Sequence, residues 1–157
     1  MPRPKVITVV GTRPELIKFS PVIPLLADVF EHRLVHSGQH YSYAMDALFF
    51  EELRLPAPDY RLEVGSASHS VQTARILERI EPVLLAEQPS AVLALGDTNT
   101  VLAAMLAAVK LHIPAVHLEA GCRSFNREMP EEINRVVADH VATWCFVPGE
   151  RERAHLQ

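Results

Sequence analysis

The sequence predicts a single α/β domain over residues 1–157, with a doubly wound and mainly parallel sheet. Two observations carry this prediction. Short runs rich in β-branched residues alternate along the chain with longer stretches of helical spacing. No repeat, low-complexity tract or Gly/Ser linker interrupts the alternation, so nothing indicates a domain boundary. Such a sheet carries helices on both faces and right-handed crossovers.

The predicted strands are short apolar runs: Val6–Val10, Arg33–His36, Val92–Leu95, Ala115–Leu118 and Trp144–Val147. The predicted helices show apolar residues three and four positions apart: Glu15–Phe30, Ala44–Leu53, Ser70–Glu87, Asn99–Leu111 and Glu131–Val141. Pro21 and Pro24 must kink or split the first helix, because proline removes a backbone donor. Residues 150–157 look like a charged tail.

Composition excludes several classes of protein. Apolar residues make up 48% and charged residues 22% of the chain, which is typical of a globular domain. A net charge of -4 gives no basic surface for nucleic acid. The apolar runs are far shorter than the roughly 20 residues that span a membrane, and we expect a cytoplasmic protein. Cys122 and Cys145 are too few for a disulfide framework, and we expect both to be buried.

Ligands of doubly wound sheets bind at the carboxyl ends of the strands, where the loops gather. Polar residues follow four of the predicted strands: Gly11-Thr12-Arg13, Ser37-Gly38-Gln39-His40, Gly96-Asp97-Thr98 and Glu119-Ala120-Gly121. Neither the dinucleotide fingerprint nor the P-loop phosphate motif is present. The loops therefore predict a site at this edge without naming its ligand.

The first of these turns begins a helix. Thr12 and Glu15 have the spacing of a capping box, which explains both residues structurally. Arg13 and Lys18 are cations at a helix start, where the macrodipole disfavours positive charge. An anionic ligand such as a phosphate or diphosphate would offset that cost. Solvated surface charge explains the two cations equally well, and both interpretations stay open.

Two carboxylates follow the central strands. Asp97 precedes a helix, which favours a helix N-cap. Glu119 ends an apolar run, where an ionised carboxylate is costly without a partner, and this favours a functional role. His117 is two residues away on the same strand, so a metal pair is conceivable. Without a third ligand, a hydrogen-bonded histidine is the better interpretation.

The last predicted helix opens with Pro130 and two acids, Glu131 and Glu132, which complement the helix dipole. Glu131 and Arg135 are four residues apart, so we expect them to form an ion pair. Taken alone, this segment is an ordinary helix start.

Five short motifs occur in one order along the chain: VVGTRPELIK, SGQHY, GDTNT, HLEAGCRS and MPEEINR. Together they resemble the non-hydrolysing UDP-N-acetylglucosamine 2-epimerase family. The resemblance implies two Rossmann-like domains with a cleft between them, similar to the B-type glycosyltransferases. This chain resembles the N-terminal domain alone and lacks the second, UDP-binding domain.

The resemblance also implies a reaction. Family members interconvert UDP-N-acetylglucosamine and UDP-N-acetylmannosamine by eliminating UDP and adding it back, without a redox cofactor or metal. By resemblance, the essential carboxylates are Asp97, Glu119 and Glu131. The residues that contact the substrate are, by the same resemblance, Arg13, Lys18, Gln39 and His40. Arg135 is expected to orient Glu131.

Several alternatives remain. If half of the site is missing, the isolated chain is inactive, and it is a fragment or one product of a split gene. A hydrolysing epimerase shares these motifs, and an acceptor domain of a B-type glycosyltransferase or a non-catalytic binding module would share the fold. The resemblance implies a homodimer. The stretch Gly65–His69 has no arginine, which argues against the regulatory substrate pocket of some bacterial members.

Overall fold

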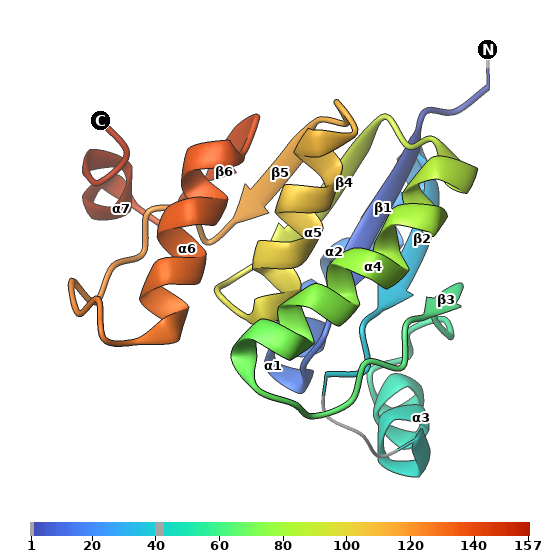
Figure 1. Cartoon of the computed structure of the whole chain (residues 1–157). Helices are drawn as coiled ribbons and strands as arrows, with labels where there is room; N and C mark the ends of the chain where they lie inside the picture. Colours follow the sequence, from blue (N-terminus) through green and yellow to red (C-terminus); the bar gives the residue numbers. More distant parts are fainter. Residues whose placement is uncertain (1, 40–42) are drawn as a thin grey trace.

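The computed structural model describes residues 2–39 and 43–157. Its sheet has six strands, all parallel, in the order β3-β2-β1-β4-β5-β6 (Figure 1). The strands are β1 (Lys5–Val10), β2 (Glu31–His36), β3 (Tyr60–Arg61), β4 (Ala91–Leu95), β5 (Ala115–Leu118) and β6 (Trp144–Phe146). The chain order reverses between β1 and β4, as in the Rossmann arrangement. The predicted doubly wound α/β class is confirmed.

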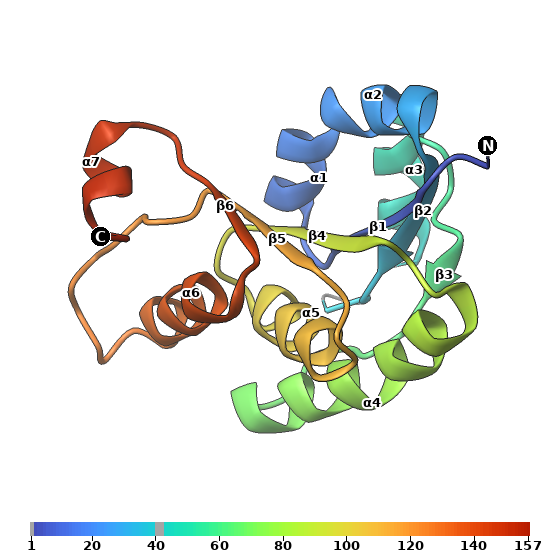
Figure 2. The same ribbon diagram turned by 90° about the horizontal axis from the view of Figure 1, so that it is seen from above.

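Helices cover both faces of the sheet (Figure 2). One face carries α1 (Arg13–Phe19), α2 (Val22–Val29) and α3 (Tyr43–Glu52). The other carries α4 (His69–Glu87), α5 (Asn99–Lys110) and α6 (Pro130–Val141), and a short α7 (Glu150–Ala154) follows β6. Two layers of helices around one sheet bury both faces of its centre, so β1 and β4 are mostly apolar rather than alternating.

The two faces have separate hydrophobic cores. Ile7 and Val9 of β1 pack with residues of α4 and α5, including Ile76. Val6 and Val10, on the opposite face of β1, pack with residues of α1 and α2, including Phe19. Successive side chains of a strand point to opposite faces, which divides β1 between the two clusters.

Most predicted elements are present, with three differences. The first predicted helix is split into α1 and α2 around Ser20 and Pro21, as the prolines indicated. The two-residue strand β3 was not predicted, because a run this short carries no periodicity. The charged tail was predicted without structure, yet Glu150–Ala154 forms α7.

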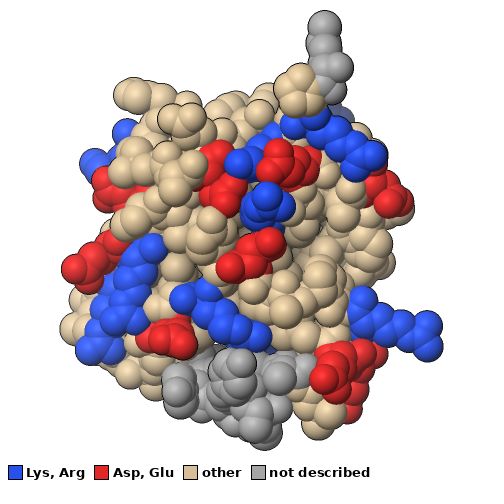
Figure 3. All heavy atoms as spheres, turned by 90° about the vertical axis from the view of Figure 1, so that its right-hand side faces the viewer, with Lys and Arg blue, Asp and Glu red and all other residues tan. Residues whose placement is uncertain are grey.

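The amino end of the sheet carries a closed network of charges. Lys5 Nζ lies 2.6 Å from Glu87 Oε2, and Tyr60 donates its hydroxyl to Glu87 Oε1. Arg33 binds Glu31 at 2.8 Å and approaches Glu87 at 3.8 Å. The hydrogen bonds from Lys5 and Tyr60 lower the pKa of Glu87. Figure 3, which views the side of β2 and β3, shows acidic and basic side chains interleaved.

Two smaller observations complete the fold. Cys122 and Cys145 are free thiols and half-buried, so the expectation of full burial was wrong. Cys145 Sγ lies 3.7 Å from the backbone oxygen of Asp139. No helix in the described part of the chain is long and apolar enough to cross a membrane.

Candidate active site

A cleft of about 690 Å³ opens at the carboxyl ends of β1, β4 and β5. It includes the point between β1 and β4 where the strand order reverses, which is the usual ligand position in doubly wound sheets. Six of the eight sequence-predicted site residues line it: Arg13, Lys18, Gln39, Asp97, Glu119 and Glu131. Arg135 lies behind the cleft lining, and His40 falls outside the described residues.

The turn after β1 forms one wall of the cleft and requires glycine. A Cβ on Gly11 would lie 2.2 Å from Thr100 Oγ1 and 2.6 Å from Ser37 Oγ. Those two hydroxyls bind each other at 2.8 Å, and Thr100 also donates to Gln39 Oε1 at 2.9 Å. Gly11 therefore lets the turn lie directly on this buried polar layer.

Glu15 joins this turn to the turn after β4. Its Oε2 accepts from the backbone N–H groups of Gly11 and Thr12 at 2.6 and 2.7 Å, so the carboxylate half of the capping box is formed. Its Oε1 accepts from the Thr98 hydroxyl at 2.7 Å. The residue is 3% exposed, and burial raises the pKa of Glu15 despite these hydrogen bonds. A residue predicted only to cap a helix thus connects two loops of the site.

The two unexplained cations both lie on α1 and both line the cleft. Lys18 Nζ lies 2.7 and 2.8 Å from the two carboxylate oxygens of Glu119. The guanidinium of Arg13 lies 5.6 Å from the centre of the Phe49 ring. Glu119 follows β5 with a left-handed φ of 61°, which ends the strand at this residue. The partner that an ionised Glu119 needs is therefore Lys18.

Asp97 does not have the predicted N-cap role. Thr98 caps α5, and its hydroxyl oxygen accepts from Val101 N at 3.4 Å. The Asp97 carboxylate instead forms an ion pair with Arg135 of α6. Arg135 also binds Glu132 Oε2 at 3.0 Å. The predicted Glu131–Arg135 pair was wrong, because the guanidinium reaches across to Asp97 and back to Glu132.

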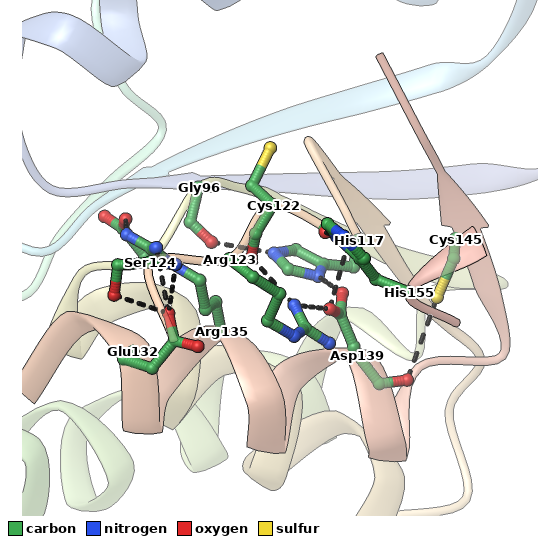
Figure 4. Close-up of polar contacts among 12 residues, drawn as sticks. Gly96, His117, Cys122, Arg123, Ser124, Glu132, Arg135, Asp139, Cys145 and His155 are labelled. Carbon is green, nitrogen blue, oxygen red and sulfur yellow. Dashed lines mark hydrogen bonds and ion pairs between the residues drawn. The ribbon is translucent and has the colours of Figure 1, made fainter. Parts of the chain in front are cut away.

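Glu131 and Glu132 have different environments at the start of α6. Glu131 lines the cleft and has no hydrogen-bond or ion-pair partner among the described residues. Glu132 is buried and accepts from Ser124 N and Oγ at 2.9 Å and from Phe125 N at 3.2 Å. Burial alone would raise the pKa of Glu132, but these hydrogen bonds and Arg135 lower it. Figure 4 shows Glu132 between Ser124 and Arg135.

A chain of side-chain amides supports the floor of the cleft. Asn134 donates to the Asp97 carbonyl at 2.9 Å and to Asn99 Oδ1 at 3.2 Å. Asn99 donates to Gln72 Oε1 at 2.8 Å, and Gln72 donates to the carbonyl of Gln39 at 3.3 Å. The loops after β2 and β4 are therefore linked through α4, α5 and α6.

His117 makes no metal pair with Glu119. Both of its ring nitrogens have oxygen partners, Asp139 Oδ1 at 2.6 Å and the Gly96 carbonyl at 2.7 Å. Among the described residues, no group of three or more His, Cys, Asp and Glu could hold a metal ion. The interpretation as a hydrogen-bonded histidine is confirmed.

Most residues that line the cleft belong to the five motifs. Comparison with known proteins identifies the family. A family model described as UDP-N-acetylglucosamine 2-epimerase matches residues 26–157. This chain belongs to the UDP-N-acetylglucosamine 2-epimerase family. Among curated epimerases, a Methanocaldococcus jannaschii relative of that name is 51% identical over 153 residues, covering 97% of this chain and 42% of the relative.

Solved structures of epimerases in the family share the fold. The Methanocaldococcus jannaschii epimerase in complex with UDP-GlcNAc and UDP superposes with a TM-score of 0.93 at 51% identity, covering 97% of this chain and 42% of that one. The Neisseria meningitidis epimerase bound to UDP-GlcNAc gives 0.90 at 36% identity, covering 97% and 42%. The chain thus spans about two fifths of the length of the epimerases that it matches.

Several residues of the site were not predicted as such. Thr98, Asn99 and Asn134 line the cleft, as does His69 at the start of α4. His69 Nδ1 lies 3.1 Å from Asn99 Nδ2. Three of these residues carried a sequence signal, because Thr98 and Asn99 belong to GDTNT and Asn134 to MPEEINR. Asp139, which binds His117 below the cleft, carried none, since it belongs to none of the five motifs.

Proposed function

We propose that the chain is the N-terminal domain of a UDP-N-acetylglucosamine 2-epimerase and that its cleft holds the sugar and diphosphate of the substrate. One observation carries the proposal: α1, the turns after β4 and β5, and the start of α6 bring two cations and, besides the buried Glu15, three carboxylates to a single cleft. Two related structures described as bound to UDP-GlcNAc support the ligand class. The complete enzyme is this chain together with a second domain, as one chain or as two.

The proposed reaction removes the C2 proton of the sugar and expels UDP from C1, which gives a double bond between C1 and C2. Reprotonation of C2 from the opposite face and return of UDP to C1 give the epimer. Developing negative charge on the diphosphate requires cations, and Arg13 and Lys18 are the two that line the cleft. Neither step requires a redox cofactor, because no carbon changes its net oxidation state between substrate and epimer.

The three carboxylates differ in their partners, which favours one of them as the base. Arg135 binds Asp97, and Lys18 binds both oxygens of Glu119. Glu131 has no cationic partner among the described residues. A base needs an oxygen that is free to meet the C2 hydrogen, and the oxygens of Asp97 and Glu119 already face cations. We therefore assign proton abstraction at C2 to Glu131, and electrostatic stabilisation of the reacting sugar to Asp97 and Glu119.

Isotope incorporation tests the proposal. In D₂O the complete enzyme should introduce deuterium at C2 of both UDP-sugars, since the removed proton exchanges with solvent. Glu131→Gln should abolish this exchange, while Glu128→Gln, an exposed residue just before the helix, serves as the matched control. Epimerisation without deuterium at C2 would contradict the mechanism. The isolated 157-residue chain should show no steady turnover, and turnover by the chain alone would contradict the two-domain proposal.

Product analysis distinguishes the proposed non-hydrolysing epimerase from a hydrolysing one. Reversible interconversion of the two UDP-sugars is expected, whereas free N-acetylmannosamine that accumulates irreversibly would indicate hydrolysis.

The identity of the UDP-sugar substrate is a separate question. A Pseudomonas aeruginosa relative named UDP-2,3-diacetamido-2,3-dideoxy-D-glucuronate 2-epimerase is 47% identical, covering 92% of this chain and 41% of the relative. We expect UDP-N-acetylglucosamine to be turned over with the higher kcat/KM of the two.

The expected homodimer and cytoplasmic location stay predictions of the resemblance. Sedimentation of the complete enzyme would test the first, and fractionation of the source cells the second. A non-catalytic binding module is the remaining alternative, and deuterium exchange distinguishes it from an enzyme.

A further inference from the structure

His117 lies beneath the cleft, fully buried, with an acceptor at each ring nitrogen (Figure 4). Nε2 is 2.7 Å from the Gly96 carbonyl oxygen, and Nδ1 is 2.6 Å from Asp139 Oδ1. A carbonyl oxygen only accepts, so Nε2 carries a hydrogen. A neutral imidazole has one N–H, so the hydrogen between Nδ1 and Asp139 decides the charge of the ring.

The surroundings of Asp139 keep that carboxyl group ionised. Its Oδ2 accepts from Gly121 N at 3.0 Å and from Arg123 Nη1 at 2.6 Å. Burial would raise the pKa of Asp139, but the hydrogen bonds from His117, Arg123 and Gly121 outweigh burial and lower it. Asp139 thus accepts from donors at both oxygens, and the geometry places the shared hydrogen on Nδ1, so that His117 donates from both ring nitrogens.

The partners of this ion pair lie next to the proposed catalytic carboxylates. Gly96 directly precedes Asp97, and Gly121 follows Glu119 by two residues. Gly121 is packed so closely that a Cβ there would lie 2.2 Å from the carbonyl oxygen of Glu152 in α7. One buried cluster thus fixes the backbone on both sides of the cleft.

We propose that His117 is a positioning residue, held as an imidazolium between Asp139 and the Gly96 carbonyl, that sets the turns carrying Asp97 and Glu119. The proposal rests on the proposed function, because it concerns the groups assigned to that reaction. An apolar side chain would fill the same space, but it would leave the Gly96 carbonyl and the Asp139 carboxylate without their shared donor.

The charge of the ring is tested on the 157-residue chain itself, without any assay of activity. With ¹⁵N-labelled histidine, both ring nitrogens of His117 should give signals of protonated nitrogen at neutral pH, and His117→Gln assigns them. In Asp139→Asn the amide can donate to Nδ1, so that nitrogen should shift to the position of an unprotonated one. A wild-type ring with one unprotonated nitrogen would overturn the proposal.

The positioning role is tested in the complete enzyme with two variants. His117→Gln keeps an N–H that can reach the Gly96 carbonyl, whereas His117→Leu removes it. We expect His117→Leu to lower kcat about 100-fold by displacing Asp97, with a much smaller change in KM and a smaller loss in His117→Gln. Equal losses in the two variants, with unchanged unfolding midpoints, would overturn the role.

A wild-type enzyme without epimerase activity would instead contradict the proposed function, and the ring signals of the isolated chain would then decide the charge of His117. If His117→Leu does not fold, Asp139→Asn takes its place. It removes the negative charge of residue 139 but keeps the hydrogen bond from His117 Nε2 to the Gly96 carbonyl. A kcat near that of wild type then supports positioning by that bond, and a 100-fold loss overturns it.

Discussion

The two ends of the sheet are both rich in charge, yet they differ in how those charges are paired. At the amino end, Lys5, Arg33, Glu31 and Glu87 neutralise one another. At the carboxyl end, neither Glu131 nor Arg13 has an oppositely charged side chain within ion-pair distance among the residues that the structure describes. Charges that are satisfied within the protein stabilise it, whereas charges left unsatisfied at a cleft are available to a ligand.

The largest effect should come from the carboxyl end. Replacing Asp97 by Asn in the complete enzyme removes the partner of Arg135 and a carboxylate of the cleft. We expect kcat for epimerisation to fall by about 100-fold, the usual effect of losing one electrostatic contact to the transition state. Affinity for UDP, measured by calorimetry, should change little. A kcat close to that of the wild type would mean that Asp97 takes no part in the reaction. The contrast between the two ends of the sheet would then fail at this residue.

A glycine of the same end should show the next largest effect, on stability. Gly11→Ala places a methyl group against Thr100 and Ser37, which are buried and hydrogen-bonded. We expect the free energy of unfolding to fall by about 1–3 kcal/mol, as in other overpacked sites. Denaturant unfolding measures it. The matched control is Gly149→Ala, whose Cβ would meet only the flexible end of Glu152 at 3.2 Å.

A double variant sharpens this result. Thr100→Ala removes the atoms nearest to the new methyl group, so Gly11→Ala should cost less in that background than alone. Strict additivity of the two changes would mean that close packing is not the reason for glycine at this position.

The pH dependence of stability tests the environment of Glu132 at the carboxyl end. Glu132 and Asp139 have pKa values below their ordinary values of 4.5 and 3.8. A lowered pKa contributes stability above the pKa of the unfolded chain, and this contribution is lost as the pH falls through the native pKa. Glu132→Gln should therefore unfold more easily at neutral pH and show a shallower loss of stability in acid. Equal slopes for the variant and the wild type would contradict the environment described for Glu132.

The smallest effect is expected at the amino end. Glu87→Gln keeps a hydrogen-bonding side chain but removes the negative charge that Lys5 and Arg33 share. We expect only a small fall in the unfolding midpoint, because partly exposed ion pairs contribute little, and no change in kcat. A large loss of kcat would show that the two ends are not independent.

The sequence predicts elements well where the signal is local. The β-branched runs, the glycine turns and the proline break between α1 and α2 all rest on residues within a few positions of one another. The partners of the site residues were harder, because they are distant in the chain. Arg135 was matched to Glu131, four residues away, but it binds Asp97, which is 38 residues away.

Burial was the second limit. Nothing in the sequence singled out Asp139, and it is the packing of residues 121–123 against it that makes it a buried acceptor. Asp97 was predicted to cap α5, but Thr98, one residue later, accepts the hydrogen bond that the cap provides. The residues lining the cleft were mostly found through the motifs, whereas the contacts that hold them required the structure.

The hydrogen bond between Thr98 and Glu15 joins residues 83 positions apart. During synthesis, the start of α1 leaves the ribosome long before β4 exists to pair with β1, so this turn lacks its second anchor until Thr98 has emerged. Long-range contacts of this kind form late and slow folding. The cleft consequently assembles well after the residues that form its first wall have been made.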